Sequence, residues 1–134
     1  MSKLYIDTNV IIDAVEGRKN KFGKNIGDYA SDLFNDAIIC KHQLVISSFT
    51  LYELYKKGIN TTIFFEMIKK KRIHLDHDES DEDKARKLKE DNFDDALHVI
   101  LAEKAQADVI ITRNIEDFKE ISTNIPVRRP EQLL

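Results

Sequence analysis

Short apolar runs alternate with segments of helical periodicity along most of this chain, and this alternation restricts the fold more than any other feature. Consecutive apolar residues predict a buried strand, whereas apolar residues that recur every three or four positions predict an amphipathic helix. Strand-like runs lie at residues 3–7, 44–48 and 72–75, late in segment 93–112, and around Val127. Strands separated by helices predict an α/β fold, a three-layer α/β/α sandwich around a central, mostly parallel sheet of roughly four to five short strands.

The helical segments carry start and stop signals. Gly58 predicts a C-terminal cap, because glycine adopts the left-handed conformation that ends many helices. Asn60, Thr61 and Thr62 each suit the start of the next helix. Helical spacing covers the residues after Asp7, residues 27–42, 49–58 and 63–71, and the first part of 93–112. The highly charged stretch 76–91 predicts a solvated loop and a surface helix.

Residues 93–118 read as a helix, a tight turn, a buried strand and a second acidic turn. The helix takes about twelve residues at ~1.5 Å each, and the strand about six at ~3.3 Å each. The two therefore have nearly equal lengths and run in opposite directions. Asp95 opens this unit and Asp117 closes it, so both carboxylates are expected at one edge of the sheet.

Two further acids are expected at the same edge. Asp7 ends the first strand, and Glu53 lies in the first turns of the helix that follows the second. In open parallel sheets the active crevice forms at the carboxyl ends of the strands. The sequence therefore predicts that Asp7, Glu53, Asp95 and Asp117 converge.

Each of these acids also has a purely structural interpretation. Asp7 and Asp117 can cap helices, and Glu53 matches a capping box with Thr50. Asp95, or its neighbour Asp94, can stabilise a helix N-terminus by its charge. Taken singly, these interpretations equal or outweigh a functional one. The convergence at one edge shifts the balance.

Converging carboxylates repel one another, and a bound cation removes that cost. Ligation by oxygen alone favours a hard ion, Mg²⁺ or Mn²⁺, over zinc. Such an ion can activate a nucleophile and stabilise charge on a transferring phosphoryl group, which points to phosphodiester hydrolysis. A phosphoryl-accepting role for Asp7 with Thr112 is the weaker alternative, because Asn9 stands where a second acid would be and no glycine-rich phosphate loop exists.

Histidines offer competing sites. His74, Asp76, His77 and Asp78 are dense enough to suggest a metal cluster, but neighbouring side chains on a strand point to opposite faces. His98 follows Asp94 and Asp95 by one turn on an otherwise apolar helix. A histidine in such a place is more often a satisfied core residue than a ligand. Neither is assigned a role.

Composition restricts the class of protein. The chain of 134 residues suits a single domain over residues 1–134, and its 42% hydrophobic content is that of a globular protein. Its net charge of −3 gives no global attraction to nucleic acid, so RNA contact would need local basic stretches such as the one containing Lys19 and Lys21. Lys69 to Arg72 either contact RNA or complement a helix dipole. No membrane span and no secretion signal are evident, which makes the cytoplasm the expected location.

Three segments together resemble the PIN domain, the small metal-dependent ribonuclease fold found in VapC-type toxins of toxin–antitoxin pairs. The matching segments are YIDTNVIID, SSFTLYEL and DDALHVILAEKAQADVIITRNIEDF. Their order and spacing in a short chain make the combination fairly specific. The resemblance implies an endoribonuclease that acts on RNA, is a homodimer and, as a toxin, is inhibited by a small antitoxin.

The resemblance also assigns roles to residues. It implies that Asp7, Glu53, Asp95 and Asp117 are the catalytic acids, and it favours Asp95 over Asp94 because the family acid directly precedes a small residue. We expect Asp7, Asp95 and Asp117 to bind Mg²⁺ or Mn²⁺, with Glu53 completing the shell or orienting water. Asn9, Thr112 and Asn114 match supporting polar positions, and Arg113, Lys19 and Lys21 are the expected RNA contacts.

Two features leave alternatives open. Asn114 occupies a place where relatives carry Asp or Asn, so the number of bound ions, one or two, depends on whether an acid is required there. The same fold also occurs in RNA processing and decay, and a catalytically inert PIN-like domain could bind RNA or protein without cutting. A DNA nuclease would share the metal chemistry.

Overall fold

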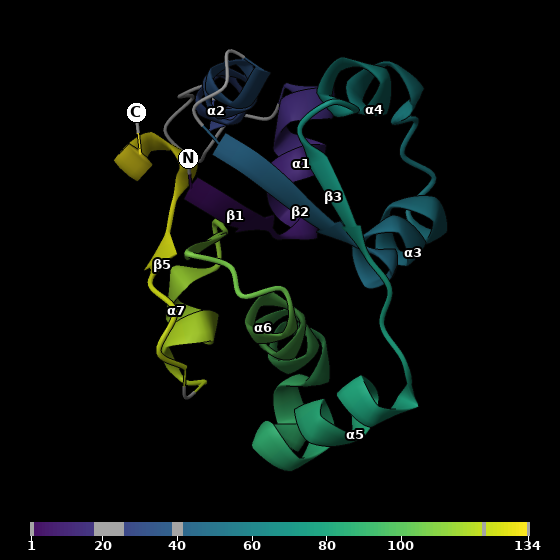
Figure 1. Ribbon diagram of the computed structural model, residues 1–134, viewed down its shortest axis with the longest axis vertical. Helices are drawn as coiled ribbons and strands as arrows, with labels where there is room; N and C mark the ends of the chain where they lie inside the picture. The colour runs from purple at the N-terminus through teal and green to yellow at the C-terminus, as the bar shows by residue number, and fades with distance from the viewer. Residues whose placement is uncertain (1, 18–25, 39–41, 122, 134) are drawn as a thin grey trace.

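The computed structural model describes residues 2–17, 26–38, 42–121 and 123–133. Within these residues five strands form one all-parallel sheet in the order β3-β2-β1-β4-β5 (Figure 1). The strands are β1 (Ser2–Ile6), β2 (His42–Ser47), β3 (Arg72–Leu75), β4 (Val109–Ile111) and β5 (Val127–Arg128). The predicted α/β class and the short strand at Val127 are confirmed, and that strand is an edge of the sheet.

Helices cover both faces of this sheet. They are α1 (Thr8–Glu16), α2 (Ile26–Ile38), α3 (Ser48–Lys56), α4 (Thr62–Ile68), α5 (Glu79–Leu88), α6 (Phe93–Lys104) and α7 (Ile115–Lys119), with 3₁₀ turns η1 (Glu90–Asn92) and η2 (Pro130–Leu133). Figure 1 shows α1, α2 and α4 above the sheet and α5, α6 and α7 below it. Among the described residues, no helix combines the length and the apolar character needed to cross a membrane.

The central strand β1 shows why helices are needed on both faces. Leu4 and Ile6 pack into the core under α1, α2 and α4, whereas Tyr5 packs into the core under α6. All three side chains are fully buried. Successive side chains on a strand point to opposite faces, so an uninterrupted apolar strand must be covered twice, as the three-layer sandwich requires.

Two predicted boundaries around β2 are wrong. Segment 27–42 was expected to be helical throughout, but His42 already pairs with Ser2 as the first residue of β2. Ser48 was expected to end the strand and instead begins α3, because the hydroxyl of Ser47 accepts the backbone N–H of Thr50 at 3.1 Å and caps the helix. Cys40, the single cysteine of the sequence, is expected from its apolar surroundings to be a core thiol with no chemical role, and it lies outside the described residues.

The connection from α3 to β3 follows the expected signals more closely. Gly58 has a φ of 70°, which confirms its role just after the end of α3. Asn60 Oδ1 accepts the backbone N–H of Thr62 at 3.2 Å at the start of α4. That helix ends at Ile68, earlier than predicted, because the following lysines form a turn in which Lys71 N–H bonds Ile68 O at 2.9 Å.

The charged stretch after β3 forms the predicted helix α5, but it is not solvated throughout. Asp81 is only 4% exposed and shares a capping box with Asp78. The ammonium group of Lys104 on α6 lies 2.8 Å from Asp81 Oδ2. Burial acts to raise the pKa of Asp81, and the hydrogen bonds from Lys104 and Asp78 outweigh it and lower that pKa. This ion pair ties α5 to α6.

Candidate metal centre

Asp7 lies where β1 ends and α1 begins. Its Oδ1 accepts the backbone N–H of Thr8 at 2.7 Å, and its Oδ2 accepts the hydroxyl of Thr112, just after β4, at 2.7 Å. The carboxylate is only 5% exposed. Asp7 is therefore the N-cap of α1, as the structural interpretation expects. The cap does not exclude a second role, because a carboxylate offers about four lone pairs and each oxygen keeps acceptor capacity.

Glu53 does not cap its helix. The predicted capping box with Thr50 is wrong, since Ser47 is the cap and Ser47 Oγ also donates to Thr50 Oγ1 at 3.1 Å. Glu53 instead points toward the end of β1, where its Oε1 accepts the hydroxyl of Thr8 at 2.5 Å. Burial acts to raise the pKa of Glu53, but hydrogen bonds from His98 and Thr8 and the charge of His98 lower it overall. Glu53 is thus held as a carboxylate.

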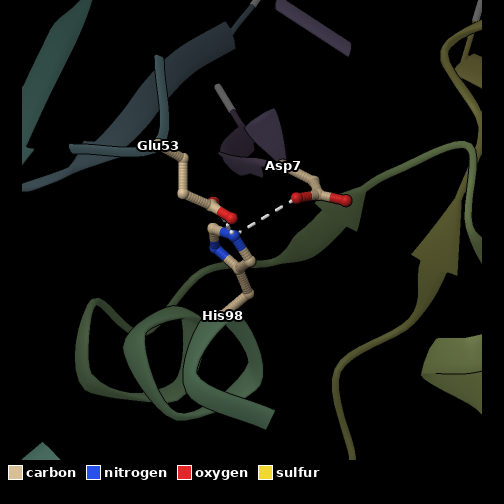
Figure 2. Close-up of side chains that lie close together, drawn as sticks. All are labelled: Asp7, Glu53 and His98. Atoms are coloured by element: carbon tan, nitrogen blue, oxygen red, sulfur yellow. Dashed lines mark hydrogen bonds and ion pairs between the residues drawn. The ribbon is translucent and has the colours of Figure 1, made fainter. Parts of the chain in front are cut away.

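His98, on α6, is the residue of this centre to which the sequence assigned no role. Its Nε2 lies 2.8 Å from Glu53 Oε1 and 3.3 Å from Asp7 Oδ1, and Figure 2 shows the ring pointing between the two carboxylates. Its Nδ1 lies 2.7 Å from the hydroxyl of Tyr5. The expectation of a buried, satisfied histidine is correct, but two of its partners are acids of the centre. The available signal was its place one turn after Asp95.

The charge of His98 complements these acids. Burial acts to lower its pKa, yet Tyr5 and the carboxylates of Asp7 and Glu53 raise that pKa well above its ordinary value. The ring is 1% exposed, so solvent screens the interaction weakly. Asp7 and Glu53 therefore favour the charged form of the His98 ring.

Asp95 lies in the first turn of α6 and is half-buried, whereas Asp94 beside it is exposed. Asn92 Nδ2 donates to Asp95 Oδ2 at 3.0 Å. Burial is the main reason that the pKa of Asp95 rises to about 6, and the charges of Asp7 and Asp117 raise it further against the effects of Asn92 and His98. The charges of two of the three other acids assigned to the site therefore affect the pKa of Asp95.

Asp117 reaches this edge from α7. Its side chain is exposed, and the next residue, Phe118, is fully buried in the core below the sheet. Its effect on the pKa of Asp95 places its charge within electrostatic reach of α6. The four acids occupy three settings: Asp7 is buried, Glu53 and Asp95 are half-buried, and Asp117 is open to solvent.

Three side chains meet a simple geometric requirement for binding a metal ion. Asp7, Glu53 and His98 each offer one ligand atom, and these atoms lie within 4.8 Å of one another. Among the described residues, the cluster suspected around His74 does not meet it. His74 pairs with Asp76 at 2.7 Å, while His77, beyond the end of β3, bonds the hydroxyl of Ser48.

The residues predicted to support the centre lie between the ends of β1 and β4. Thr112 Oγ1 accepts the backbone N–H of Asn114 at 3.0 Å while it donates to Asp7. Asn9 Oδ1 accepts the backbone N–H of Arg113 at 3.4 Å. Thr112 therefore connects the start of α7 with the carboxylate of Asp7. Asn114 contributes through its backbone in this network.

Of the predicted RNA contacts, only Arg113 lies among the described residues. The guanidinium of Arg113 lies 2.6 Å from Glu131 and 3.6 Å from Asp13, so two carboxylates of the chain already engage it. Its contact with RNA stays a prediction. Lys19 and Lys21 lie outside the described residues.

The raised pKa of Asp95 predicts a pH-dependent stability difference. The folded state prefers the protonated carboxyl, so metal-free protein loses stability as the pH rises from ~4 through ~6. Asp95→Asn cannot ionise, and with EDTA present it should equal wild type near pH 4 and exceed it by on the order of 1 kcal/mol at pH 8, after allowance for solvent screening. Urea unfolding across this pH range measures the difference. Asp94→Asn is the control, and a gain for it equal to that of Asp95→Asn would contradict the prediction.

Comparisons with known proteins place this geometry in a family. No curated protein sequence matches the chain. VapBC2 from Rickettsia felis, bound to a promoter DNA fragment, is similar in structure (18% identity, TM-score 0.64, 95% of this chain and 98% of that one). So are a toxin–antitoxin complex from Klebsiella pneumoniae (21%, 0.62, 95% and 97%) and FitAB bound to the IR36 DNA fragment (15%, 0.60, 95% and 94%). The PIN domain model matches residues 3–116, and the chain therefore belongs to the PIN domain family.

Proposed function

We propose that residues 1–134 act as one PIN domain that hydrolyses RNA phosphodiester bonds with Mg²⁺ or Mn²⁺. The observation that carries this proposal is the convergence of acids around Asp95, whose pKa of about 6 reflects burial and the charges of Asp7 and Asp117. A protein gains nothing in stability from such a cluster of like charges. A bound divalent cation would compensate the repulsion between these carboxylates.

The acids assigned to the site offer carboxylate oxygens, the donors that a hard divalent ion prefers. Asp7, Asp95 and Asp117 would hold it, and Glu53 would complete the shell or orient water, so the donors are carboxylate oxygens. When bound, the ion supplies an activated water and stabilises charge on the phosphoryl group. The chain contributes orientation: Thr112 and the backbone of Thr8 hold Asp7, and the hydroxyl of Thr8 holds Glu53.

A role as the toxin of a type II toxin–antitoxin pair is the second part of this proposal. The structural neighbour from Klebsiella pneumoniae is a toxin–antitoxin complex, and the VapBC2 and FitAB chains are matched over nearly their full lengths. A small antitoxin and a second copy of the chain are the partners that this role requires, and the cytoplasm is where it would act. Co-expression with the product of any short reading frame next to the gene tests the pairing, since a toxin should inhibit growth alone and not with its antitoxin.

Metal dependence is the direct test of the nuclease. Purified protein should cleave structured RNA in millimolar Mn²⁺ and lose that activity in EDTA, and Mn²⁺ should raise its Tm because a ligand that binds only the folded state stabilises it. A matched DNA substrate shows whether the 2′-hydroxyl is required. Equal cleavage with Mn²⁺ and EDTA would refute the proposal. A Tm that Mn²⁺ does not move would favour a binding module.

A further inference from the structure

A buried hydrogen-bond chain enters the metal centre from the core. Tyr5 is fully buried on β1, and its hydroxyl lies 3.0 Å from Ser47 Oγ and 2.7 Å from His98 Nδ1. On the other side of the ring, His98 Nε2 faces Glu53 and Asp7. Each of these groups is a polar atom taken out of water, so its hydrogen bonds determine where it can lie. The chain links the interior of the sheet to the two most enclosed acids.

Hydrogen-bond donors are distributed unevenly over the carboxylate oxygens of Glu53 and Asp7. Glu53 Oε1 accepts from both Thr8 Oγ1 and His98 Nε2, which leaves Oε2 for another partner. Asp7 Oδ1 accepts from Thr8 N–H and lies 3.3 Å from His98 Nε2, while Oδ2 accepts from Thr112. The imidazole therefore hydrogen-bonds Glu53 Oε1 and lies within ion-pair distance of Asp7 Oδ1, and both oxygens already have a protein donor. It holds both carboxylates in orientation and leaves Glu53 Oε2 free of it.

We propose that His98 is a positioning residue of this centre. Its Nε2–H holds Glu53 and Asp7 in the orientation that binds the ion, and Tyr5 fixes the orientation of the imidazole ring. The proposal rests on the metal site of the proposed nuclease. A metal ligand would need a bare Nε2 lone pair, whereas Nε2 at 2.8 Å and 3.3 Å from two carboxylate oxygens is held there by an N–H. An N–H at that place is attracted by both. Partners of this kind orient ligands and contribute about 10-fold to 100-fold to metal affinity.

Tyr5 has a distinct part in this arrangement. Its hydroxyl lies within hydrogen-bond distance of both His98 Nδ1 and Ser47 Oγ. The tyrosine and histidine rings pack edge to face with centroids 5.6 Å apart. Phe49 packs on the same imidazole at 5.0 Å. The ring therefore has little freedom to tilt, and Nε2 points at the carboxylates.

Two substitutions of His98 by amide residues test the roles of its two ring nitrogens separately. His98→Gln places an N–H near the position of Nε2, whereas His98→Asn reaches only as far as Nδ1 and Tyr5. Mn²⁺ affinity, measured by the EPR signal of free Mn²⁺ and independent of any activity, should stay near wild type in His98→Gln and fall about 10-fold or more in His98→Asn. Tyr5→Phe should lose about 3-fold to 10-fold, the range expected for one hydrogen bond. Val99→Ala is the control, because it opens the buried core beside His98 and should lower Tm without changing the Mn²⁺ affinity.

The nitrogen coupling of bound Mn²⁺ gives a second readout. Electron spin-echo spectroscopy should show no directly bonded imidazole nitrogen, and a strong ¹⁴N coupling would overturn the proposal by making His98 a ligand. Wild-type Mn²⁺ affinity in His98→Asn would also overturn it. If His98→Asn does not fold, Tyr5→Phe decides, and wild-type affinity there is the contrary result. Mn²⁺ binding without RNA cleavage would refute the nuclease alone, and absence of Mn²⁺ binding to wild type would refute both.

Discussion

Asp7→Asn is expected to reduce RNA cleavage by about a hundredfold or more without destabilising the metal-free protein. Asparagine can still accept the N–H of Thr8 through Oδ1, and the hydroxyl of Thr112 can rotate to accept from the new amide, so the cap of α1 is kept. The lost group is a negative charge. Removing it relieves repulsion of Asp95, whose pKa the charge of Asp7 raises, and this offsets the lost attraction between Asp7 and His98 Nε2 at 3.3 Å. Initial cleavage rates and Tm in EDTA measure the two effects.

A merely structural role for Asp7 predicts the opposite pattern, with a lower Tm and little specific loss of activity. Asp94→Asn is the matched control, because it removes the same charge from an exposed position two residues before Ala96. It should cleave RNA at the wild-type rate. Asp7→Asn activity within a few-fold of wild type would remove Asp7 from the proposed mechanism.

Phe118→Ala is expected to destabilise the protein by about 3–5 kcal/mol, which is a large share of the stability of a typical domain. Phe118 is fully buried against the core that α6 and β4 share, directly after Asp117. Truncation leaves a cavity and frees the short helix α7. Because the same helix presents Asp117, Mn²⁺ affinity should fall as well. Urea unfolding and the free-Mn²⁺ signal measure the two effects.

Phe118→Leu is the comparison for that prediction. It keeps most of the apolar volume, so it should lose much less stability than the alanine variant. A loss below about 1 kcal/mol in Phe118→Ala would mean that the site collapses without penalty. In that case the packing of Phe118 would not be what holds Asp117 at the sheet edge.

Periodicity was sufficient to predict the layers of this fold. The consecutive apolar residues of β1 and the helical spacing after Asp7 act within a few residues, so local pattern alone predicts these elements. The parallel sheet is the expected arrangement because parallel strands need a crossover connection, which is usually a helix. The same reasoning brought Asp7 and Asp95 to one edge. The boundaries were less predictable: His42 joins β2 because it pairs with Ser2, and Ser48 begins α3 because Ser47 caps that helix.

The contacts that complete the centre depend on residues far apart in the chain. Glu53 matched a capping box with Thr50 in sequence, yet it bonds Thr8 and His98, each 45 positions away. Asp81 reads as one more surface charge until Lys104 meets it 23 positions later. The partners of His98 lie on β1, at the junction of β1 and α1, and on α3, and no local pattern encodes them.

Secondary structure, parallel direction and the edge at which acids gather are therefore properties of the sequence pattern, because each arises from short-range propensity and the two-sided burial of strands. The tertiary structure decided which side chains meet at that edge. Burial there removes water from Asp7, Glu53 and His98, so the partners each one finds determine its charge and orientation. For Glu53 that partner is a histidine rather than its own helix.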